Sequence, residues 1–314
     1  MIDKKKICIV SPCYNESSNI EELYARVSEI WKRYPQYNFN YLFIDNASKD
    51  DTVEKLRVLS NNDSRVKVII NTRNFGHIRS PYYGIIQSEG DATIYLASDL
   101  QDPPELIPSF IEEWERGYKV ILATKPTSSK GGMMHSIRKL YYRFLDSISE
   151  VPLTKDTTGF GLYDKIVLDE VRKINDPYPY LRGIICEIGF EIKTIIFSQP
   201  PRLRGISKNN FYTLYDIGIL GIISHSLVPI RLAIFCGFAL GALSLFSAIG
   251  FFIAKLIWWD SFPMGIAPII IVMFGMFGIL LMFIGILGEY VGSIHTYVQN
   301  RPIVVEKERI NFDK

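Results

Sequence analysis

The sequence predicts a soluble α/β domain with a mostly parallel sheet, followed by a hairpin of two transmembrane helices. Residues 1–208 alternate short β-rich runs with polar, helix-patterned segments, a rhythm typical of a sheet with helices on both faces. Two later stretches, Leu232–Ala254 and Ser261–Gly288, carry no charged side chain. Each exceeds the ~20 apolar residues that a helix needs to cross the ~30 Å hydrocarbon core of a bilayer.

The bulk composition excludes some classes of function. The chain has 314 residues and a net charge of +2, so no strong positive field favours a nucleic-acid partner. The spacing of its four cysteines, Cys8, Cys13, Cys186 and Cys236, is not that of a metal site, and a reducing cytoplasmic setting fits them. We therefore expect neither a disulfide framework nor a nucleic-acid-binding protein.

The elements of the α/β domain follow from the apolar spacing. Ile20, Leu23, Val27 and Ile30 recur at helical intervals and predict the first helix. Short β-rich runs between helix-patterned segments predict the strands. The expected helices cover residues 19–33, 52–59 and 77–88, and the expected strands cover residues 7–10, 41–44, 66–70, 92–97 and 119–123.

Polar residues follow four of the predicted strands. Ligands of open parallel sheets bind in the crevice beyond the carboxyl ends of the strands. We therefore expect one crevice lined by these four strand ends. They are residues 14–16, 45–46, 71–74 and 98–99.

The segment after the fourth strand divides into two parts. Asp102 precedes Pro103 and lies three positions before Glu105, the pattern of a helix N-cap with a capping box. Asp99 lies before that helix and has no capping role. Its carboxylate, with the Gln101 amide two residues on, suits a hard cation such as Mg²⁺ or Mn²⁺, which is often shared with substrate phosphates. A turn residue is the alternative for Asp99.

Two common nucleotide-binding motifs are missing from the sequence. It contains no G-x-x-x-x-G-K-[ST] loop and no G-x-G-x-x-G after the first strand, which disfavours P-loop and nicotinamide-dependent proteins. Cys13 follows the first strand, but no known spacing ties a histidine to it. A thiol nucleophile therefore has little support.

Charge asymmetry orients the membrane segments. No apolar signal-peptide core follows the charged N-terminus, so we expect the large domain in the cytoplasm. Two spans would return the tail to the same side, and the basic residues Arg231, Arg301 and Lys307 agree with the positive-inside rule. We expect a multi-pass protein of the cytoplasmic membrane. Two buried core helices are the alternative to the two spans.

The expected division of the chain has four parts. Residues 1–208 form the α/β domain, and residues 209–230 an interfacial amphipathic segment, for which a core helix is the alternative. Residues 231–290 form the transmembrane hairpin, and residues 291–314 a cytoplasmic tail.

Several motifs together resemble the inverting glycosyltransferase family 2, of the GT-A fold. Within it they are similar to the polyprenyl-phosphate glycosyltransferases, which include bactoprenol glucosyltransferases and dolichol-phosphate mannose synthases. The resemblance covers nearly the whole chain. The segments that carry it are Ser11–Glu16, Ile44–Thr52, Arg73–His77, Asp99–Glu105, Arg204–Lys208, Gly288–Gly292 and Asn300–Pro302.

The resemblance implies roles for individual residues. The metal, Mg²⁺ or Mn²⁺, would bind Asp99 and Gln101, and the catalytic residues would be Asp156 and Asp99. The residues implied for the donor nucleotide sugar are Pro12, Tyr14, Asn15, Glu16, Asp45, Asn46, Gly76, His77, Ser98 and Asp99. Those implied for the acceptor phosphate are Arg138, Arg143, Arg202, Arg204 and Lys208.

The sequence departs from the family pattern at two positions. The metal motif usually reads Asp-x-Asp, and its first position here is Ala97. The second acidic residue of the motif that begins at Asp156 is Gly159. A phosphate acceptor is already anionic at pH 7, so Asp156 has three open roles: general base, positioning group or structural turn.

The resemblance implies transfer of one sugar from a nucleotide sugar, with UDP-glucose favoured, to undecaprenyl phosphate at the membrane. Transfer of mannose from GDP-mannose is an alternative. A processive polysaccharide synthase of the same superfamily is disfavoured. Such enzymes usually carry a Gln-x-x-Arg-Trp motif, and no tryptophan in this sequence follows an arginine. A degenerate relative that binds nucleotide or acts as a scaffold is a further alternative. The family also suggests a homo-oligomer, with a tetramer as one candidate.

Overall fold

The computed structural model describes residues 4–125, 157–174, 176–177, 179–198, 266–299 and 301–312, with single positions between 230 and 257. The chain forms two compact units. The first comprises Met1–Gly221 together with Asn300–Lys314, and the second comprises Ile222–Gln299.

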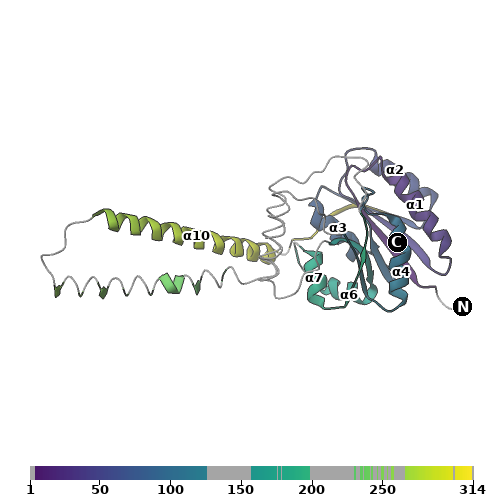
Figure 1. The fold of residues 1–314 in the computed structure, drawn as a ribbon. Helices are drawn as coiled ribbons and strands as arrows, with labels where there is room; N and C mark the ends of the chain where they lie inside the picture. The colour runs from purple at the N-terminus through teal and green to yellow at the C-terminus, as the bar shows by residue number, and fades with distance from the viewer. Residues whose placement is uncertain are drawn as a thin grey trace. The chain divides into compact units, whose positions relative to one another are not determined.

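The first unit is built on an eight-stranded sheet (Figure 1). Its strand order is β7-β5-β6-β4-β1-β2-β3-β8. The pairs β1–β2, β1–β4, β2–β3 and β5–β7 are parallel, so the prediction of a mostly parallel sheet is confirmed. The strands are β1 (Lys6–Cys13), β2 (Asn38–Asp45), β3 (Val66–Asn71), β4 (Ala92–Tyr95), β5 (Val120–Thr124), β6 (Thr157–Asp164), β7 (Ile192–Ile196) and β8 (Glu306–Ile310).

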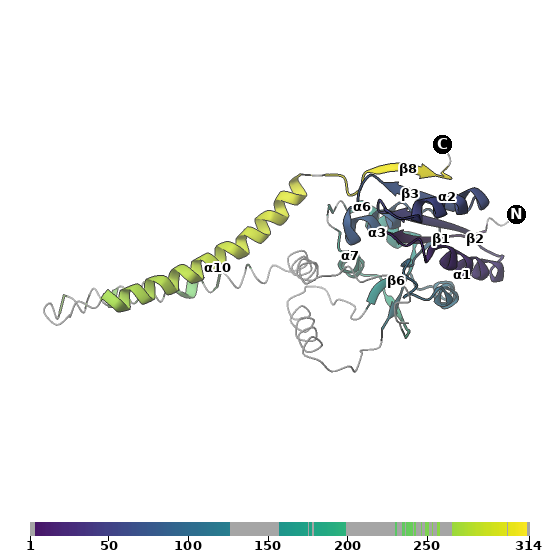
Figure 2. The same cartoon turned by 90° about the horizontal axis from the view of Figure 1, so that it is seen from above.

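Helices cover both faces of this sheet, as Figure 2 shows. Successive side chains of a strand point to opposite faces, so Ile7 and Ile9 of β1 join one core while Cys8 and Val10 join the other. The first core lies under α1 (Ile20–Arg33), α2 (Thr52–Asn62) and α4 (Ile107–Glu115). The second lies under α3 (Gly76–Ile86), α6 (Lys165–Lys173) and α7 (Leu181–Ile188).

Strand β1 is longer than the predicted run that ends at Val10. It continues through Pro12 to Cys13, which pairs with Asp45 of β2. The carbonyl of Val10 accepts from Leu96 on the β4 side, and that of Cys13 accepts from Asn46 on the β2 side. This alternation turns Pro12 toward β4 after pairing with β4 has ended, so its missing N–H costs no ladder bond.

The C-terminal residues are not a separate tail, which corrects the predicted division of the chain. They contribute β8, which pairs antiparallel with β3 and forms one edge of the sheet. The Thr72 backbone N–H donates to Val305 at 3.0 Å, and the Arg57 guanidinium donates to the Glu308 carboxylate at 2.8 Å. The sequence of β8, Glu-Lys-Glu-Arg-Ile, has the charges expected of a protected sheet edge.

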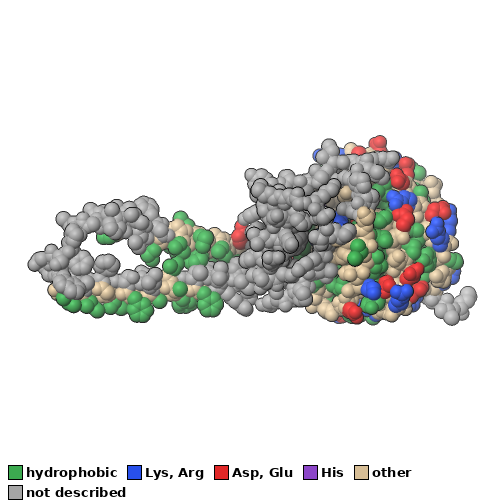
Figure 3. Space-filling model, viewed as in Figure 1, with side chains coloured by type: hydrophobic (Ala, Val, Ile, Leu, Met, Phe, Trp, Pro, Cys, Tyr) green, Lys and Arg blue, Asp and Glu red, His purple; other side chains and the backbone are tan. Residues whose placement is uncertain are grey.

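The second unit contains one long described helix, α10 (Ile266–Val298). Its segment Met276–Val298 is long and apolar enough to cross a membrane, by length and composition. Figure 3 shows mainly hydrophobic side chains on its described surface, while charged side chains of both signs are interspersed over the visible face of the first unit. The helix also continues past the predicted hairpin end at residue 290.

The other predicted membrane segments are described only in part. Single positions such as Phe238 and Ile253 are helical, but most of the first predicted span lies outside the described residues. The interfacial segment 209–230 lies outside them too, except for its last residue. The first span therefore stays a prediction.

Gly84 generates a stability prediction, because α3 meets the sheet at this residue. A Cβ there would lie 2.9 Å from Cγ2 of Ile44 and 3.0 Å from Cγ1 of Val10. We expect Gly84→Val to lower the free energy of unfolding by about 1–3 kcal/mol through overpacking, measured by chemical denaturation. Ala25→Val, on the exposed side of α1, should cost about 0.5 kcal/mol. Equal losses in the two variants would contradict this close approach.

Candidate active site

Strained backbone marks the carboxyl edge of the sheet. Three residues other than glycine adopt the left-handed region there: Asn15 at φ 57°, Ala47 at φ 60° and Leu100 at φ 60°. They follow β1, β2 and β4 respectively. Such a conformation costs about 1–2 kcal/mol per residue and persists where surrounding contacts hold it, often at functional sites.

Hydrogen bonds join the loops after β1 and β2. The Asn15 backbone N–H donates to Oγ of Ser48 at 2.9 Å, and Oδ1 of Asn15 accepts from the Lys49 backbone at 2.8 Å. The Glu16 backbone N–H donates to Oγ1 of Thr52 at 2.9 Å. These strand ends therefore meet in one edge, as the sequence predicts.

Asp45 ends β2 with a buried carboxylate. It accepts from the Ser48 backbone N–H at 2.9 Å and from the Ser48 hydroxyl. Burial raises the pKa of the Asp45 carboxyl, and the bonds from Ser48 oppose that rise. The residue lines a polar cavity of about 300 Å³ whose wall includes Arg57 of α2 and Lys307 of β8. This cavity has the polar lining that a nucleoside would require.

The carboxamide of Asn46 organises the loop that begins α3. Its Nδ2 donates to Oδ1 of Asn74 at 2.9 Å and to the Gly76 carbonyl at 3.0 Å. Its Oδ1 accepts from the Phe75 backbone N–H at 2.8 Å and from Nδ2 of Asn71 at 3.2 Å. Asn46 thereby holds Gly76 in place, next to His77 in the sequence. Its own carboxamide bonds to protein partners and not to a ligand.

Ser98 lies deeper than a ligand-binding role suggests. Its hydroxyl is buried, donates to the Pro12 carbonyl at 2.8 Å and lies 3.1 Å from the Cys13 thiol. The bond ties the loop after β4 to the end of β1. Ser98 thus supports the edge from below, and Tyr14 and Glu16 stand closer to its surface.

The predicted capping box at Asp102 is wrong. A short 3₁₀ helix begins at Pro104, and the residue at its N-cap is Pro103, without a side-chain cap bond. The Asp102 carboxylate is 3% exposed and turns back toward the Ala97 backbone N–H. Burial, and then the negative charge of Asp99, raise the pKa of Asp102 to about 7. Two carboxylates are therefore within electrostatic reach of each other, where the sequence predicts one.

This pair fits a divalent cation. Oδ1 of Asp99 accepts from the Gln101 backbone N–H at 3.2 Å, which orients the loop. Within the described residues, no group of three or more His, Cys, Asp or Glu side chains could hold a metal. Mg²⁺ commonly takes one or two protein carboxylates and completes its shell with water and substrate phosphates, so two are sufficient. A cation would also relieve the repulsion between them.

The departure from the family pattern at Gly159 has a conformational explanation. Gly159 adopts φ +88°, in the region that disfavours side chains, and its carbonyl accepts from the Tyr163 hydroxyl at 2.8 Å. An aspartate there would be strained. Ala97 is half-buried, and its side chain supplies no metal ligand.

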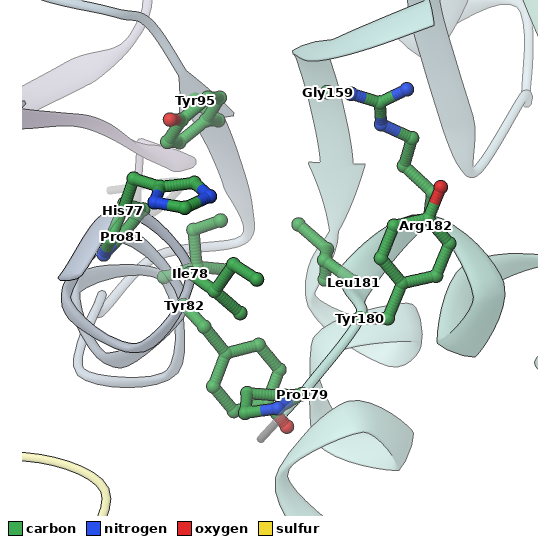
Figure 4. A pocket seen from close by; sticks show the side chains of 11 residues that line it. His77, Ile78, Pro81, Tyr82, Tyr95, Gly159, Pro179, Tyr180, Leu181 and Arg182 are labelled. Atoms are coloured by element: carbon green, nitrogen blue, oxygen red, sulfur yellow. The ribbon is translucent and has the colours of Figure 1, made fainter. Parts of the chain in front are cut away.

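A second cavity, of about 150 Å³, lies between α3 and the start of α7 (Figure 4). His77 and Tyr95 lie on one side of it, and Gly159 and Arg182 on the other. His77 reaches the surface, yet nearby protein removes enough water to lower the pKa of its imidazole. Tyr95 and Arg182 are not predicted from the sequence, because neither stands in a motif or in a polar strand-end cluster.

The remaining predicted site residues lie outside the described residues. They are Asp156, Arg138, Arg143, Arg202, Arg204 and Lys208. Their roles stay predictions.

The fold and this edge define a class of protein that binds its ligand across the carboxyl ends of a parallel sheet. The family model described as Glycosyl transferase family 2 matches residues 8–171, and the chain belongs to this family. The matched region contains the whole strand-end edge and the Asp99–Asp102 pair.

Relatives align over nearly the full chain. The uncharacterized glycosyltransferase YkcC of Bacillus subtilis is 33% identical over 312 residues, covering 97% of this chain and 94% of that protein. The bactoprenol glucosyl transferase of Shigella phage SfII is 29% identical over 304 residues, covering 96% of this chain and 98% of that protein.

Solved structures resemble the chain less closely. Glucosyl-3-phosphoglycerate synthase from Mycobacterium tuberculosis in complex with UDP has a TM-score of 0.46 and 17% identity, covering 70% of this chain and 78% of that one. These values are too low for its ligands to be carried over.

The hydrogen bonds of the Asn46 carboxamide lead to a prediction about stability. We expect Asn46→Ala to lower the free energy of unfolding by about 2 kcal/mol, because each buried polar group left without a partner costs about 1–3 kcal/mol. Chemical denaturation measures this loss. Asn38→Ala, at the exposed start of β2, is the matched control and should keep wild-type stability. Unaltered stability in Asn46→Ala would refute this role.

Proposed function

We propose that the protein is a membrane-bound inverting glycosyltransferase that transfers one glucose from UDP-glucose to a polyprenyl phosphate such as undecaprenyl phosphate. The observation that carries the proposal is the close pair Asp99 and Asp102 at the strand-end edge. It occurs in a chain that aligns almost end to end with a bactoprenol glucosyl transferase.

The proposed reaction is a single displacement. A phosphate oxygen of the acceptor forms a bond to the anomeric carbon while the bond from that carbon to the UDP oxygen breaks, which inverts the configuration. The acceptor oxygen is already anionic, so no proton transfer is required. Negative charge then moves onto the departing diphosphate.

The chain's own residues bind and orient the donor. Asp45 and the loops held by Ser48 and Asn46 would form the nucleoside site, beside the polar cavity. Asp99 and Asp102, with the Gln101 amide near them, would hold Mg²⁺ or Mn²⁺. When bound, the cation stabilises charge on the leaving diphosphate.

The C-terminal strand supports an even number of membrane crossings. β8 pairs with β3, so the residues after α10 must lie on the same side of the membrane as the α/β unit. If α10 crosses, one further segment must cross as well. The uncharged stretch Leu232–Ala254 supplies the natural candidate.

The activity test uses purified full-length protein, undecaprenyl phosphate, Mg²⁺ or Mn²⁺ and labelled UDP-glucose or GDP-mannose, with label in the lipid phase as the readout. We expect glucose transfer, its loss with a chelator, and a decrease of about 10²–10³-fold in Asp99→Asn, in line with the loss of one electrostatic contact to the leaving group. Asp169→Asn, on the exposed face of α6, should transfer normally.

Three other outcomes would overturn parts of the proposal. Transfer from GDP-mannose alone would replace the donor. Transfer that continues in the presence of a chelator would exclude a metal requirement. UDP binding without any transfer would favour the degenerate, non-catalytic alternative.

Topology can be tested by cysteine labelling in intact cells with a membrane-impermeant maleimide. We expect labelling of Asp260→Cys, between the two predicted spans, and protection of Lys314→Cys at the chain end until the membrane is permeabilised. External labelling of Lys314→Cys would contradict two crossings.

A further inference from the structure

The cavity between α3 and α7 has two chemically different ends. Along α3, Ile78, Pro81, Tyr82 and Ile85 recur at i, i+3, i+4 and i+7 and form an apolar stripe. At 1.5 Å per residue the stripe is about 10 Å long. Leu181 faces it from the other wall (Figure 4). The cavity is therefore a groove with an apolar side at this end.

The other end of the groove is polar and cationic. It contains His77, Tyr95, Gly159 and Arg182. The charge of Arg182 opposes the rise that burial causes in the pKa of the Tyr95 and Tyr163 phenols, so its guanidinium lies near both. No hydrogen bond or ion pair joins this half-buried guanidinium to another residue in the part of the chain that the structure describes. A cation in that setting attracts an anion.

The polar end adjoins the carboxylate pair. Tyr95 is the last residue of β4, four positions before Asp99, and the charges of Asp102 and Asp99 both contribute to raising the pKa of its phenol. An anion at Arg182 would therefore lie beside the position proposed for the metal and the donor diphosphate. The apolar stripe leads away from that position along α3.

We propose that this groove binds the acceptor lipid, with its phosphate at Arg182 and its first isoprene units along the apolar stripe of α3. The inference rests on the proposed function and deepens it, because it assigns the acceptor subsite to residues that carry no family motif. A guanidinium is suited to phosphate, since its fork of N–H donors matches the phosphate oxygens. His77, with a lowered pKa, adds a hydrogen-bonding group rather than a second charge.

The combination of the two ends selects the ligand class. A nucleotide or free sugar would leave its polar groups against Ile78, Pro81 and Leu181, which is unfavourable without hydrogen-bond partners. An uncharged prenol would leave Arg182 without a counter-ion among the residues that the structure describes. A phosphate joined to a branched hydrocarbon chain satisfies both ends at once.

The test measures binding separately from transfer, using full-length protein in detergent. Titrations with farnesyl phosphate, inorganic phosphate and UDP are compared for wild type, Arg182→Gln, Arg182→Lys and Ile78→Asn. The matched controls are Arg116→Gln and Val58→Asn, at exposed positions of the same unit. Circular dichroism confirms folding, and Arg182→Lys keeps the charge if the glutamine variant is unstable.

We expect Arg182→Gln to weaken farnesyl phosphate binding by about 10- to 100-fold, the loss of one charge-assisted hydrogen bond, and to leave UDP affinity unchanged. Arg182→Lys should bind with intermediate affinity. Ile78→Asn should weaken farnesyl phosphate but not inorganic phosphate. In transfer assays, Arg182→Gln and Ile78→Asn should each raise KM for undecaprenyl phosphate more than KM for UDP-glucose.

Several results would overturn the inference. Weaker UDP binding in Arg182→Gln would assign the arginine to the donor. Unchanged farnesyl phosphate binding in Arg182→Gln and Ile78→Asn would mean that another segment of the chain fills the groove. A third result is that wild type transfers glucose to undecaprenyl phosphate while Arg182→Gln and Ile78→Asn keep the wild-type KM for this acceptor. In that case only this inference fails. If wild type neither binds nor glucosylates a polyprenyl phosphate, the proposed function fails and the inference with it.

Discussion

A single buried carboxamide holds the working edge of this protein together. Asn46 bonds at once to Asn71 at the end of β3, to the Phe75 backbone and to the Gly76 carbonyl at the start of α3. Because α3 begins where these bonds place it, this contact also positions the groove along α3. The close approach of Gly84 then fixes the same helix against β1 and β2.

Sequence patterns predicted the central elements because those elements are buried on one or both sides. The run 41–44 and the spacing in 20–30 leave little choice of structure, and the strand-end polar residues follow from them. β8 escaped detection because an edge strand protected by charge carries no apolar alternation. Its partner also lies more than two hundred residues away in the sequence, and local patterns cannot report such pairing.

The candidate site was predicted in outline and changed in one chemical detail. The position of Asp99 directly after a strand was sufficient to predict it as a metal ligand. Asp102 matched the pattern of a helix N-cap, so no role beside the metal was predicted for it. The structure turns Asp102 inward, and burial near Asp99 decides its chemistry. Gly159 and Arg182 show the same limit, since backbone conformation and the facing wall of a groove depend on tertiary structure.

The late position of β8 in the chain has a consequence for biosynthesis. β3 ends at Asn71 and its outer partner begins at Glu306, with the apolar stretches between them. At about 5–20 residues per second, the ribosome takes on the order of 10–50 s to reach that partner. The edge of β3 lacks its outer partner during this time. The sheet can be completed only after Glu306–Ile310 have been synthesised, so the first unit closes at the very end of translation.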